Sequence, residues 1–399
     1  MDLDAFRELL TPHGRKALAD AERTVAEGAD AVAAAVALRR TYPAGLAGAA
    51  LTQARLRARA AAKFGADAAV MYFTPDGLEQ ATRAEVAAHR ARRFGPGDRV
   101  ADACCGVGGD LLALARAGCR VDAVDRDPLT VEAARANAAA LGLSGLVTVT
   151  VGDAAAVTPE RYDALFADPG RRTTGRRVFD PQAYSPPWPD VLALAARARG
   201  ACLKVAPGVP YEVLPPGAEA EWVSWRGEVK EAAVWTGALA TASVEPGPGD
   251  VVLRRATMLP SGLSLTPDPA LGDPPVGPVG RYLYEPDGAA IRAHLVAEVA
   301  ASVDGRLLDP RIAYITGDGP AVTPWASRYE VRETLPFSLK RLRAALRSRD
   351  IGTVTLKKRG SALDVERLRR DLRLSGGNSG IVVLTRIGEH PYALICEPA

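Results

Sequence analysis

The chain has 399 residues, of which 48% are hydrophobic and 24% are charged, and its formal net charge is +3. This composition is typical of a globular protein with room for two or three domains. The first residues lack the basic and then apolar pattern of a secretory signal, and no apolar run approaches the roughly 18 residues of a membrane span, so we expect a cytoplasmic protein without membrane partners.

The first part of the chain, residues 1–95, is rich in alanine, arginine and leucine. The runs 20–40 and 51–65 carry apolar residues at helical spacing, and few strand-like stretches interrupt them. We therefore predict a small helical N-terminal domain over residues 1–95.

The pattern changes at residue 96, where short β-rich runs begin to alternate with helical runs. This alternation predicts an α/β, Rossmann-like domain over residues 96–265, with a parallel sheet, helices on both faces and a ligand at the carboxyl ends of the strands. The predicted strands are 98–104, 120–125, 147–153, 163–169 and 201–207, and the predicted helices are 108–118, 127–143 and 188–200.

Residues 266–280 contain five prolines and three glycines and are predicted to form a linker. Helices and strands alternate again after it, so we predict a separate α/β domain over residues 281–399. Its predicted helices are 287–301, 336–349 and 364–374, and its predicted strands are 352–360, 380–388 and 392–398.

The cysteines and histidines do not form a recognisable site. The five cysteines are odd in number without a Cys-x-x-Cys pair, and the four histidines are scattered. We therefore expect neither a disulfide framework nor a metal site. Cys104 and Cys105 stand beside three glycines, and we interpret them as small side chains of a tight loop.

The stretch DACCGVGGD begins at Asp102, between the first predicted strand and its helix. Gly106 and Gly108 in this stretch leave room for backbone amides to touch a ligand. The second strand ends at Asp125, whose carboxylate is placed to accept hydrogen bonds from two ribose hydroxyls. The third strand ends at Asp153, a place from which an adenine amino group can be recognised.

The fourth strand places Asp168 and Pro169 at the expected mouth of the reaction site. This order of strand ends resembles the class I S-adenosylmethionine-dependent methyltransferases, whose first loop has the form acidic-x-x-x-Gly-x-Gly. The dehydrogenase fingerprint needs a third glycine, where this chain has Leu111. The resemblance implies S-adenosylmethionine as the cofactor. The expected cofactor contacts are Gln80, Thr82, Asp102, Cys104, Gly106, Gly108, Asp125, Arg126, Gly152, Asp153, Ala154 and Asp168.

Residues 60–240 are similar to the trimethylguanosine synthase branch, whose members methylate the exocyclic N2 of guanine. The similarity rests on MYFTPDGLEQATRAEVAAHRARRF, DACCGVGGD, RVDAVDRDP and EWVSWRGEVKEAAVW. It implies that the segment around Glu79, Gln80 and Thr82 lies against the methionine end of the cofactor.

The chain departs from that branch after the fourth strand. N-methyltransferases of this kind carry an Asp/Asn/Ser-Pro-Pro-aromatic motif there, which holds an amino group and stacks on the base. Here Asp168 and Pro169 are followed by Gly170, Arg171 and Arg172. The sequence SPPW at residues 185–188 spells the missing motif, but a helix that starts with proline explains it adequately.

Basic residues gather in the last domain. Residues 331–374 contain 13 Lys and Arg against five acidic residues, a pattern that favours RNA binding. Lys357, Lys358 and Arg359 are consecutive and cannot all be core residues, and Arg171 and Arg172 suggest an anionic substrate at the reaction site. The full layout resembles bacterial methyltransferases with a C-terminal THUMP-like domain; true THUMP domains present tRNA to modification enzymes.

We therefore expect an S-adenosylmethionine-dependent RNA methyltransferase that acts on a base amino group of tRNA or rRNA, with Asp168 and Pro169 in catalytic positions. An alternative is a ribose 2'-O-methyltransferase, which resembles the heat-shock type with its Lys-Asp-Lys-Glu quartet. Asp168, Lys204 and a glutamate of strand six, Glu228 or Glu231, then take part, and the first lysine has no clear counterpart. A small-molecule methyltransferase and a non-catalytic RNA-binding protein are further alternatives.

Overall fold

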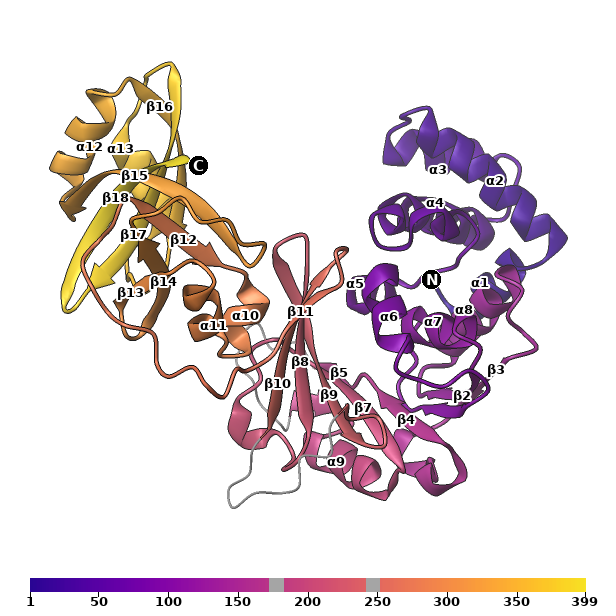
Figure 1. Cartoon of the computed structure of the whole chain (residues 1–399). Helices are drawn as coiled ribbons and strands as arrows, with labels where there is room; N and C mark the ends of the chain where they lie inside the picture. The colour runs from indigo at the N-terminus through magenta and orange to yellow at the C-terminus, as the bar shows by residue number, and fades with distance from the viewer. Residues whose placement is uncertain (172–182, 242–251) are drawn as a thin grey trace. The chain divides into compact units, whose positions relative to one another are not determined.

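The computed structural model describes residues 1–171, 183–241 and 252–399. Within these residues the chain forms two compact units. The first consists of residues 1–221 and 231–253, and the second of residues 222–230 and 254–399 (Figure 1).

The first unit begins with helices, as the sequence predicts. Each of the first three is capped at its N-terminus by a side-chain oxygen, from Asp2, Thr11 and Asp30. Gly28, with a φ of +77°, separates the second helix from the third. The helices are α1 (Leu3–Leu9), α2 (Pro12–Ala26), α3 (Ala31–Arg39), α4 (Ala44–Phe64), α5 (Pro75–Gln80) and α6 (Ala84–Ala91).

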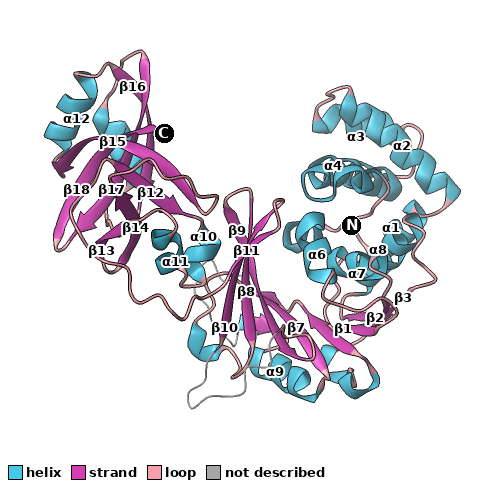
Figure 2. Cartoon of the chain, in the orientation of Figure 1, coloured by secondary structure: helices cyan, strands magenta, loops and turns pink. Residues whose placement is uncertain are grey.

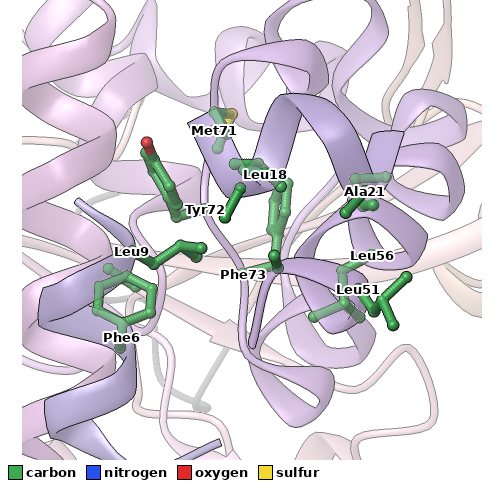
Figure 3. Packing of buried hydrophobic residues seen from close by; sticks show 14 of the residues in the cluster. Phe6, Leu9, Leu18, Ala21, Leu51, Leu56, Met71, Tyr72 and Phe73 are labelled. Atoms are coloured by element: carbon green, nitrogen blue, oxygen red, sulfur yellow. The ribbon is translucent and has the colours of Figure 1, made fainter. Parts of the chain in front are cut away.

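These helices share one hydrophobic core with the elements that follow them. Phe6, Leu18 and Phe73 are at most 2% exposed and pack together, as Figure 3 shows. Val107 and Leu112, which belong to the sheet-and-helix part of the unit, lie in the same cluster. The helical region is thus packed directly onto the region that carries the glycine loop.

The predicted parallel sheet follows, with α7 (Gly109–Arg116) and α8 (Pro128–Ala140) on one side and α9 (Trp188–Arg197) on the other (Figure 2). The strands run in the order β3 (Val147–Val151), β2 (Arg120–Asp125), β1 (Arg99–Asp102), β4 (Ala164–Ala167), β7 (Gly200–Val205) and β9 (Glu228–Gly237). The first five are parallel, and β9 is antiparallel to β7. The Rossmann-like fold expected from the sequence is confirmed.

Five further strands lie between residues 170 and 265. The pair β5 (Gly170–Arg171) and β6 (Tyr184–Ser185) forms a small antiparallel ladder directly after β4. The nine-stranded sheet also contains β8 (Glu219–Trp225), β10 (Leu253–Leu259) and β11 (Leu263–Leu265).

The second unit has a seven-stranded sheet in the order β13-β14-β12-β15-β18-β17-β16. Neighbouring strands are antiparallel, except that β16 and β17 are parallel. The strands are β12 (Tyr282–Pro286), β13 (Arg306–Asp309), β14 (Ile312–Gly317), β15 (Ala326–Pro336), β16 (Ile351–Lys358), β17 (Asn378–Ile387) and β18 (His390–Pro398). The helices are α10 (Gly288–Arg292), α11 (Val296–Ala301), α12 (Leu339–Arg347) and α13 (Val365–Leu372).

One predicted helix of the second unit is wrong. Residues 287–301 form two short helices, α10 and α11, because the chain takes a left-handed conformation at His294, with a φ of +55°. Among the described residues, no helix is both long and apolar enough to cross a membrane.

Candidate active site

A cavity of about 340 Å³ lies in the first unit, beside the residues that follow β1, β2, β3 and β4. Parallel strands bind ligands at this edge because their carboxyl ends leave a crevice there. Nine of the expected residues line it: Gln80, Thr82, Cys104, Gly106, Asp125, Arg126, Gly152, Ala154 and Asp168. Five others that the sequence singled out do not line it: Asp102, Gly108, Asp153, Pro169 and Lys204.

The glycine loop forms one wall of this cavity. Gly106 and Gly108 have φ values of +54° and +94°, which side chains other than glycine rarely adopt. Apart from the two neighbouring residues, no atom lies within 4 Å of where a side chain would begin at Gly106, so the loop leaves open space toward the cavity. Gly108 is the N-cap of α7, and its role is to turn the chain into that helix.

The carboxylate of Asp125 holds the loop from the neighbouring strand. Its Oδ2 accepts a hydrogen bond from the Gly106 amide at 3.1 Å, and its Oδ1 accepts one from the Asp127 amide at 3.0 Å. Each carboxylate oxygen has a second lone pair for a ligand. Asp153 instead caps a short helical turn by accepting from the Ala155 amide, and its half-exposed carboxylate lies 3.8 Å from Arg126.

Asp102 lies beneath the cavity wall and is fully buried. Its Oδ1 accepts a hydrogen bond from the Cys104 amide at 3.2 Å, whereas its Oδ2 is buried without a partner among the described residues. Burial, followed by the negative charge of Asp110, raises the pKa of Asp102 well above its usual value. Because this carboxyl group is buried and does not line the cavity, it supports the glycine loop from behind.

The two cysteines of the loop are poor nucleophiles. Burial and the negative charge of Asp102 raise the pKa of both the Cys104 and the Cys105 thiols well above the usual value. Because the thiolate is the reactive form, these side chains stay protonated and inert near neutral pH. This agrees with their interpretation as small loop residues.

We expect the native protein to resist alkylation by iodoacetamide at pH 8. All five cysteines are free, and the pKa is raised above its usual value at every one of them, to about 11 at Cys119. Peptide mass spectrometry after labelling, with and without guanidinium chloride, measures this. Five labelled cysteines are expected only in denaturant; rapid labelling of Cys104 in the native protein would contradict it.

Asp168 is the acidic group that faces the cavity near its mouth. It follows β4 directly, and its Oδ2 accepts a hydrogen bond from Lys204 Nζ on β7 at 2.5 Å. Asp168 keeps 28% of its side chain exposed, whereas Lys204 keeps 14% and does not reach the cavity surface. Lys204 therefore supports Asp168 from behind, and Pro169 is buried.

The SPPW sequence lies closer to this site than we expected. β6 pairs with β5 so that Ser185 lies opposite Gly170, and Ser185 and Pro186 line the cavity. Trp188, however, is 2% exposed, and its Nε1 donates to the Val213 carbonyl. Ser185 and Pro186 of this motif thus line the cavity. The indole of Trp188 belongs to the core and offers no surface on which a base could stack.

A buried ionic network, which we did not predict, lies next to the cavity. Arg90 of α6 is 2% exposed and binds two carboxylates, those of Asp110 on α7 and Glu231 on β9. Thr82 Oγ1 also donates to Asp110, at 2.7 Å. Burial raises the pKa of Asp110, but the charges of Arg90 and Lys204 lower it more, so the net shift is downward.

This network joins the helical region to the cavity, because Asp110 and Thr82 both line it. The guanidinium of Arg90 also lies over the ring of Phe166, another lining residue, at 5.2 Å. Asp110 follows the glycine pair directly in the sequence, and that position was the one available signal. Arg90 looked like any other arginine of a helical region. The remaining lining residues that the sequence missed are Gly77, Ala81, Ala103, Cys105, Val107, Gly109, Asp127, Gly170, Ser185 and Pro186.

Lys63 anchors the segment that carries Gln80 and Thr82. Its Nζ donates to the carbonyl oxygens of Leu78, Glu79 and Ala81 at 2.7–2.9 Å, where α5 ends. The last carbonyls of a helix lack partners within the helix, and a lysine ammonium satisfies them. Lys63 is therefore a clamp that holds the end of α5 beside the cavity.

We expect the Lys63→Met variant to bind S-adenosylmethionine about tenfold more weakly than the wild type, a loss of about 1.4 kcal/mol. Removal of the ammonium leaves three carbonyls without their charged donor and loosens the segment that carries Gln80 and Thr82. Isothermal titration calorimetry measures the Kd. Lys16→Met, at an exposed lysine of α2, is the matched control. Equal affinity of the Lys63 variant and the wild type for S-adenosylmethionine would contradict the proposed role of Lys63 in holding this segment.

The quartet of the ribose-methylation alternative is assembled only in part. Asp168 and Lys204 are paired, but the Glu231 carboxylate is bound to Arg90. Glu228 pairs with Lys230 on the surface. Both glutamates lie on β9 beside β7, so they belong to the seventh strand of the sheet in chain order, and the expected place in strand six is wrong.

The five residues expected to contact RNA lie in different parts of the chain and have different partners. Arg171 ends β5, beside the cavity-lining Gly170, and Arg172 lies outside the described residues. In the second unit Lys357 Nζ donates to Glu285 Oε2 at 2.5 Å, and Arg359 lies 4.0 Å from the same carboxylate. Lys358 points to the other face, as strand geometry requires, and donates to the Leu363 carbonyl. Within the described residues, no group of three or more His, Cys, Asp or Glu side chains is arranged to hold a metal ion.

Family profiles match three parts of the chain. A family described as a methyltransferase domain matches residues 100–169, and one described as THUMP domain-like matches residues 326–398. A domain of unknown function matches residues 2–60. The matched regions contain the glycine loop, the C-terminal sheet and the first helices.

Relatives and solved structures agree with these matches. The chain is 38% identical over 357 residues to an uncharacterized S-adenosylmethionine-dependent methyltransferase of Mycobacterium tuberculosis H37Rv, covering 86% of this chain and 95% of the relative. It is 44% identical over 72 residues to a protein-L-isoaspartate O-methyltransferase of Methylorubrum extorquens, covering 18% of this chain and 31% of that enzyme. The crystal structure of a candidate methyltransferase from Porphyromonas gingivalis W83 shares the fold, with a TM-score of 0.74, 20% identity and coverage of 96% and 98%.

Proposed function

This chain belongs to the S-adenosylmethionine-dependent methyltransferases, and we propose that it methylates a base amino group, of the guanine N2 type, in tRNA or rRNA. The observation that carries the proposal is the position of Asp168. Its carboxylate lines the same cavity as the glycine loop and is held there by Lys204. A carboxylate in this place is suited to accept a hydrogen bond from the amino group that is to be methylated.

The residues of the cavity fit the cofactor. The open loop at Gly106 supplies space for a ligand, and the Asp125 carboxylate at the cavity wall supplies acceptors for hydroxyl groups. We propose that Gln80 and Thr82 lie near its methionine end, on the segment that Lys63 clamps. When bound, S-adenosylmethionine supplies an activated methyl group.

The protein then has to align the acceptor and exclude water. Asp168 accepts an N–H of the exocyclic amine, which leaves the nitrogen lone pair directed into the cavity. The carbonyl groups near Ser185 and Pro186 are suited to take the second N–H, since both residues line the same cavity. The proton released after methylation passes to solvent through the exposed side of Asp168, so no strong base is needed.

The ribose alternative receives less support from the geometry. A hydroxyl acceptor needs a base or a lysine that lowers its pKa, and Lys204 lies behind Asp168 and away from the cavity surface. The Glu231 carboxylate is occupied by Arg90, and Lys63 is occupied by backbone carbonyls. An amine attacks through its lone pair without prior deprotonation, so it suits this site better.

RNA as the substrate is supported by the THUMP-like match and by the charge of the same region. We propose that residues 281–399 recruit RNA, that residues 96–265 carry out methyl transfer, and that residues 1–95 support the cofactor cavity. The predicted linker, residues 266–280, lies within the second unit, and we propose that the reaction takes place in the cytoplasm.

Nucleoside analysis tests the substrate. RNA from a strain without the gene and from its parent is digested and compared by mass spectrometry, with complementation by the wild-type gene and by Asp168→Ala. We expect one methylated base, such as N2-methylguanosine, to disappear and to return only with the wild-type gene. Loss of a 2'-O-methylnucleoside would favour ribose methylation, and an unchanged set of nucleosides would favour a small-molecule substrate.

A further inference from the structure

Helices α12 and α13 of the second unit present their basic residues on one side. Leu342 and Leu346 of α12 are completely buried, and Leu368 and Leu372 of α13 are at most 6% exposed. All four belong to one core cluster that includes β16 and β17 residues, so both helices lie on the same face of the sheet. With the leucines turned inward, the charged positions of both helices face solvent.

The outward side is defined by six exposed residues, which we call the α12–α13 basic surface: Lys340, Arg341, Arg347, Arg367, Arg370 and Arg373. α12 contains four Lys and Arg residues and no acidic residue. α13 with its C-cap contains four arginines and two acidic residues. The surface therefore carries a concentrated positive charge in a chain whose total is only +3.

Most of this charge is not neutralised within the protein. Among the described residues, only Arg367 of the six has a carboxylate within 4.0 Å, that of Asp371 at 3.6 Å in an exposed i, i+4 pair. Arg347 instead donates to the Arg373 carbonyl, and Arg343 donates to the Asp371 carbonyl, at the end of α13. Contacts to carbonyl groups join the two helices and leave the net charge of the arginines in place.

The strand residues that the sequence singled out behave in the opposite way. The carboxylate of Glu285 binds Lys357, lies 4.0 Å from Arg359 and accepts a hydrogen bond from Tyr329. Burial lowers the pKa of Lys357, but its hydrogen bonds to Glu285 and Tyr329 raise it more, to about 12. Lys357 and Arg359 are thus internal partners of a partly buried acid and have little charge to offer a ligand.

We propose that the α12–α13 basic surface, and not the strand at residues 357–359, binds the sugar-phosphate backbone of RNA. This inference rests on the proposed function. Neither helix contains an aromatic residue, so the surface has no platform on which bases stack, whereas guanidinium groups match phosphate oxygens in geometry and charge. The surface therefore recognises structured RNA by its backbone and leaves the choice of nucleotide to the cavity.

The test compares two charge-reversed triple variants of the full chain. Lys340→Glu/Arg341→Glu/Arg370→Glu alters the surface, and Lys16→Glu/Arg39→Glu/Arg40→Glu changes the net charge equally at exposed residues of the first unit. Fluorescence anisotropy with labelled tRNA gives the Kd over a range of KCl concentrations. Thermal unfolding of each variant confirms that it is folded, and titration with S-adenosylhomocysteine shows that the cavity still works.

We expect the variant with the three substitutions in α12 and α13 to bind tRNA at least tenfold more weakly than the wild type. The slope of log Kd against the logarithm of the KCl concentration should become smaller by about two to three, because each phosphate contact contributes roughly one to that slope. The first-unit variant and Lys357→Gln/Arg359→Gln should resemble the wild type. Equal tRNA affinity of the helix variant and the wild type would contradict the role of the α12–α13 basic surface and leave the proposed function untouched. Displacement of tRNA by polyglutamate as readily as by unlabelled tRNA would assign the surface to acidic proteins. Failure of the wild type to bind RNA would overturn both this inference and the RNA part of the proposed function.

Discussion

Substitution of Asp168 by alanine is expected to lower kcat for methyl transfer to RNA by at least about a hundredfold, because the acceptor amine loses the group that orients it. The Kd of the cofactor should change much less, since the Asp125 carboxylate and the glycine loop stay in place. Single-turnover transfer from methyl-labelled S-adenosylmethionine measures kcat, and calorimetry measures the Kd. Full activity of Asp168→Ala would contradict the assigned role.

The Asp168→Asn variant separates the two chemistries. An asparagine keeps a carbonyl oxygen that accepts a hydrogen bond from an amine, so Asp168→Asn should retain much more activity than Asp168→Ala. A ribose hydroxyl needs the negative charge that pairs with Lys204, and in that case both variants are equally inactive. The ratio of the two rates therefore distinguishes amine from hydroxyl methylation.

Substitution of Arg90 by methionine is expected to lower the free energy of unfolding of the first unit by about 3–5 kcal/mol. Arg90 is completely enclosed, and its removal leaves the carboxylates of Asp110 and Glu231 buried without their partner. Urea unfolding followed by tryptophan fluorescence measures the change. Arg92→Met, at an exposed arginine directly after the same helix, is the control and should cost little.

A second substitution identifies the source of that cost. If uncompensated charge is responsible, Glu231→Gln added to Arg90→Met should restore part of the lost stability, because one buried carboxylate is removed. If lost packing is responsible, the double variant should be no more stable than Arg90→Met. A loss for Arg90→Met no larger than that for Arg92→Met would show that the network contributes nothing to stability.

The sequence was most informative where local patterns decide the structure. The strand predicted at 120–125 has those bounds in the structure, and the helices predicted at 108–118 and 127–143 form with slightly shorter bounds. Alternating apolar runs and the glycines at 106 and 108 are local signals, since a parallel strand and a left-handed turn each leave their mark within a few residues. Nine of the expected cofactor residues line the cavity, and two of these, Gln80 and Thr82, were expected from the family resemblance and not from a local pattern.

The sequence was least informative where distant segments meet. Ser185 reaches the cavity because β6 pairs with β5, and Arg90 joins α7 to β9. Lys357 looked like a surface residue, but Glu285 lies 72 positions away along the chain and contacts it. The spacing of apolar residues along the sequence does not predict such pairs, because each pair depends on the packing of elements that lie far apart in the chain.

The most direct test of the proposed function uses purified protein, S-adenosylmethionine with an isotopically labelled methyl group, and RNA from cells that lack the gene. After the reaction, the RNA is digested to nucleosides, and the position of the label is found by mass spectrometry. We predict a labelled methyl group on a base amino nitrogen with the wild-type protein and none with Asp168→Ala. A label on the ribose would contradict the proposal. So would the absence of any label in RNA when the same protein sample is shown to bind S-adenosylmethionine.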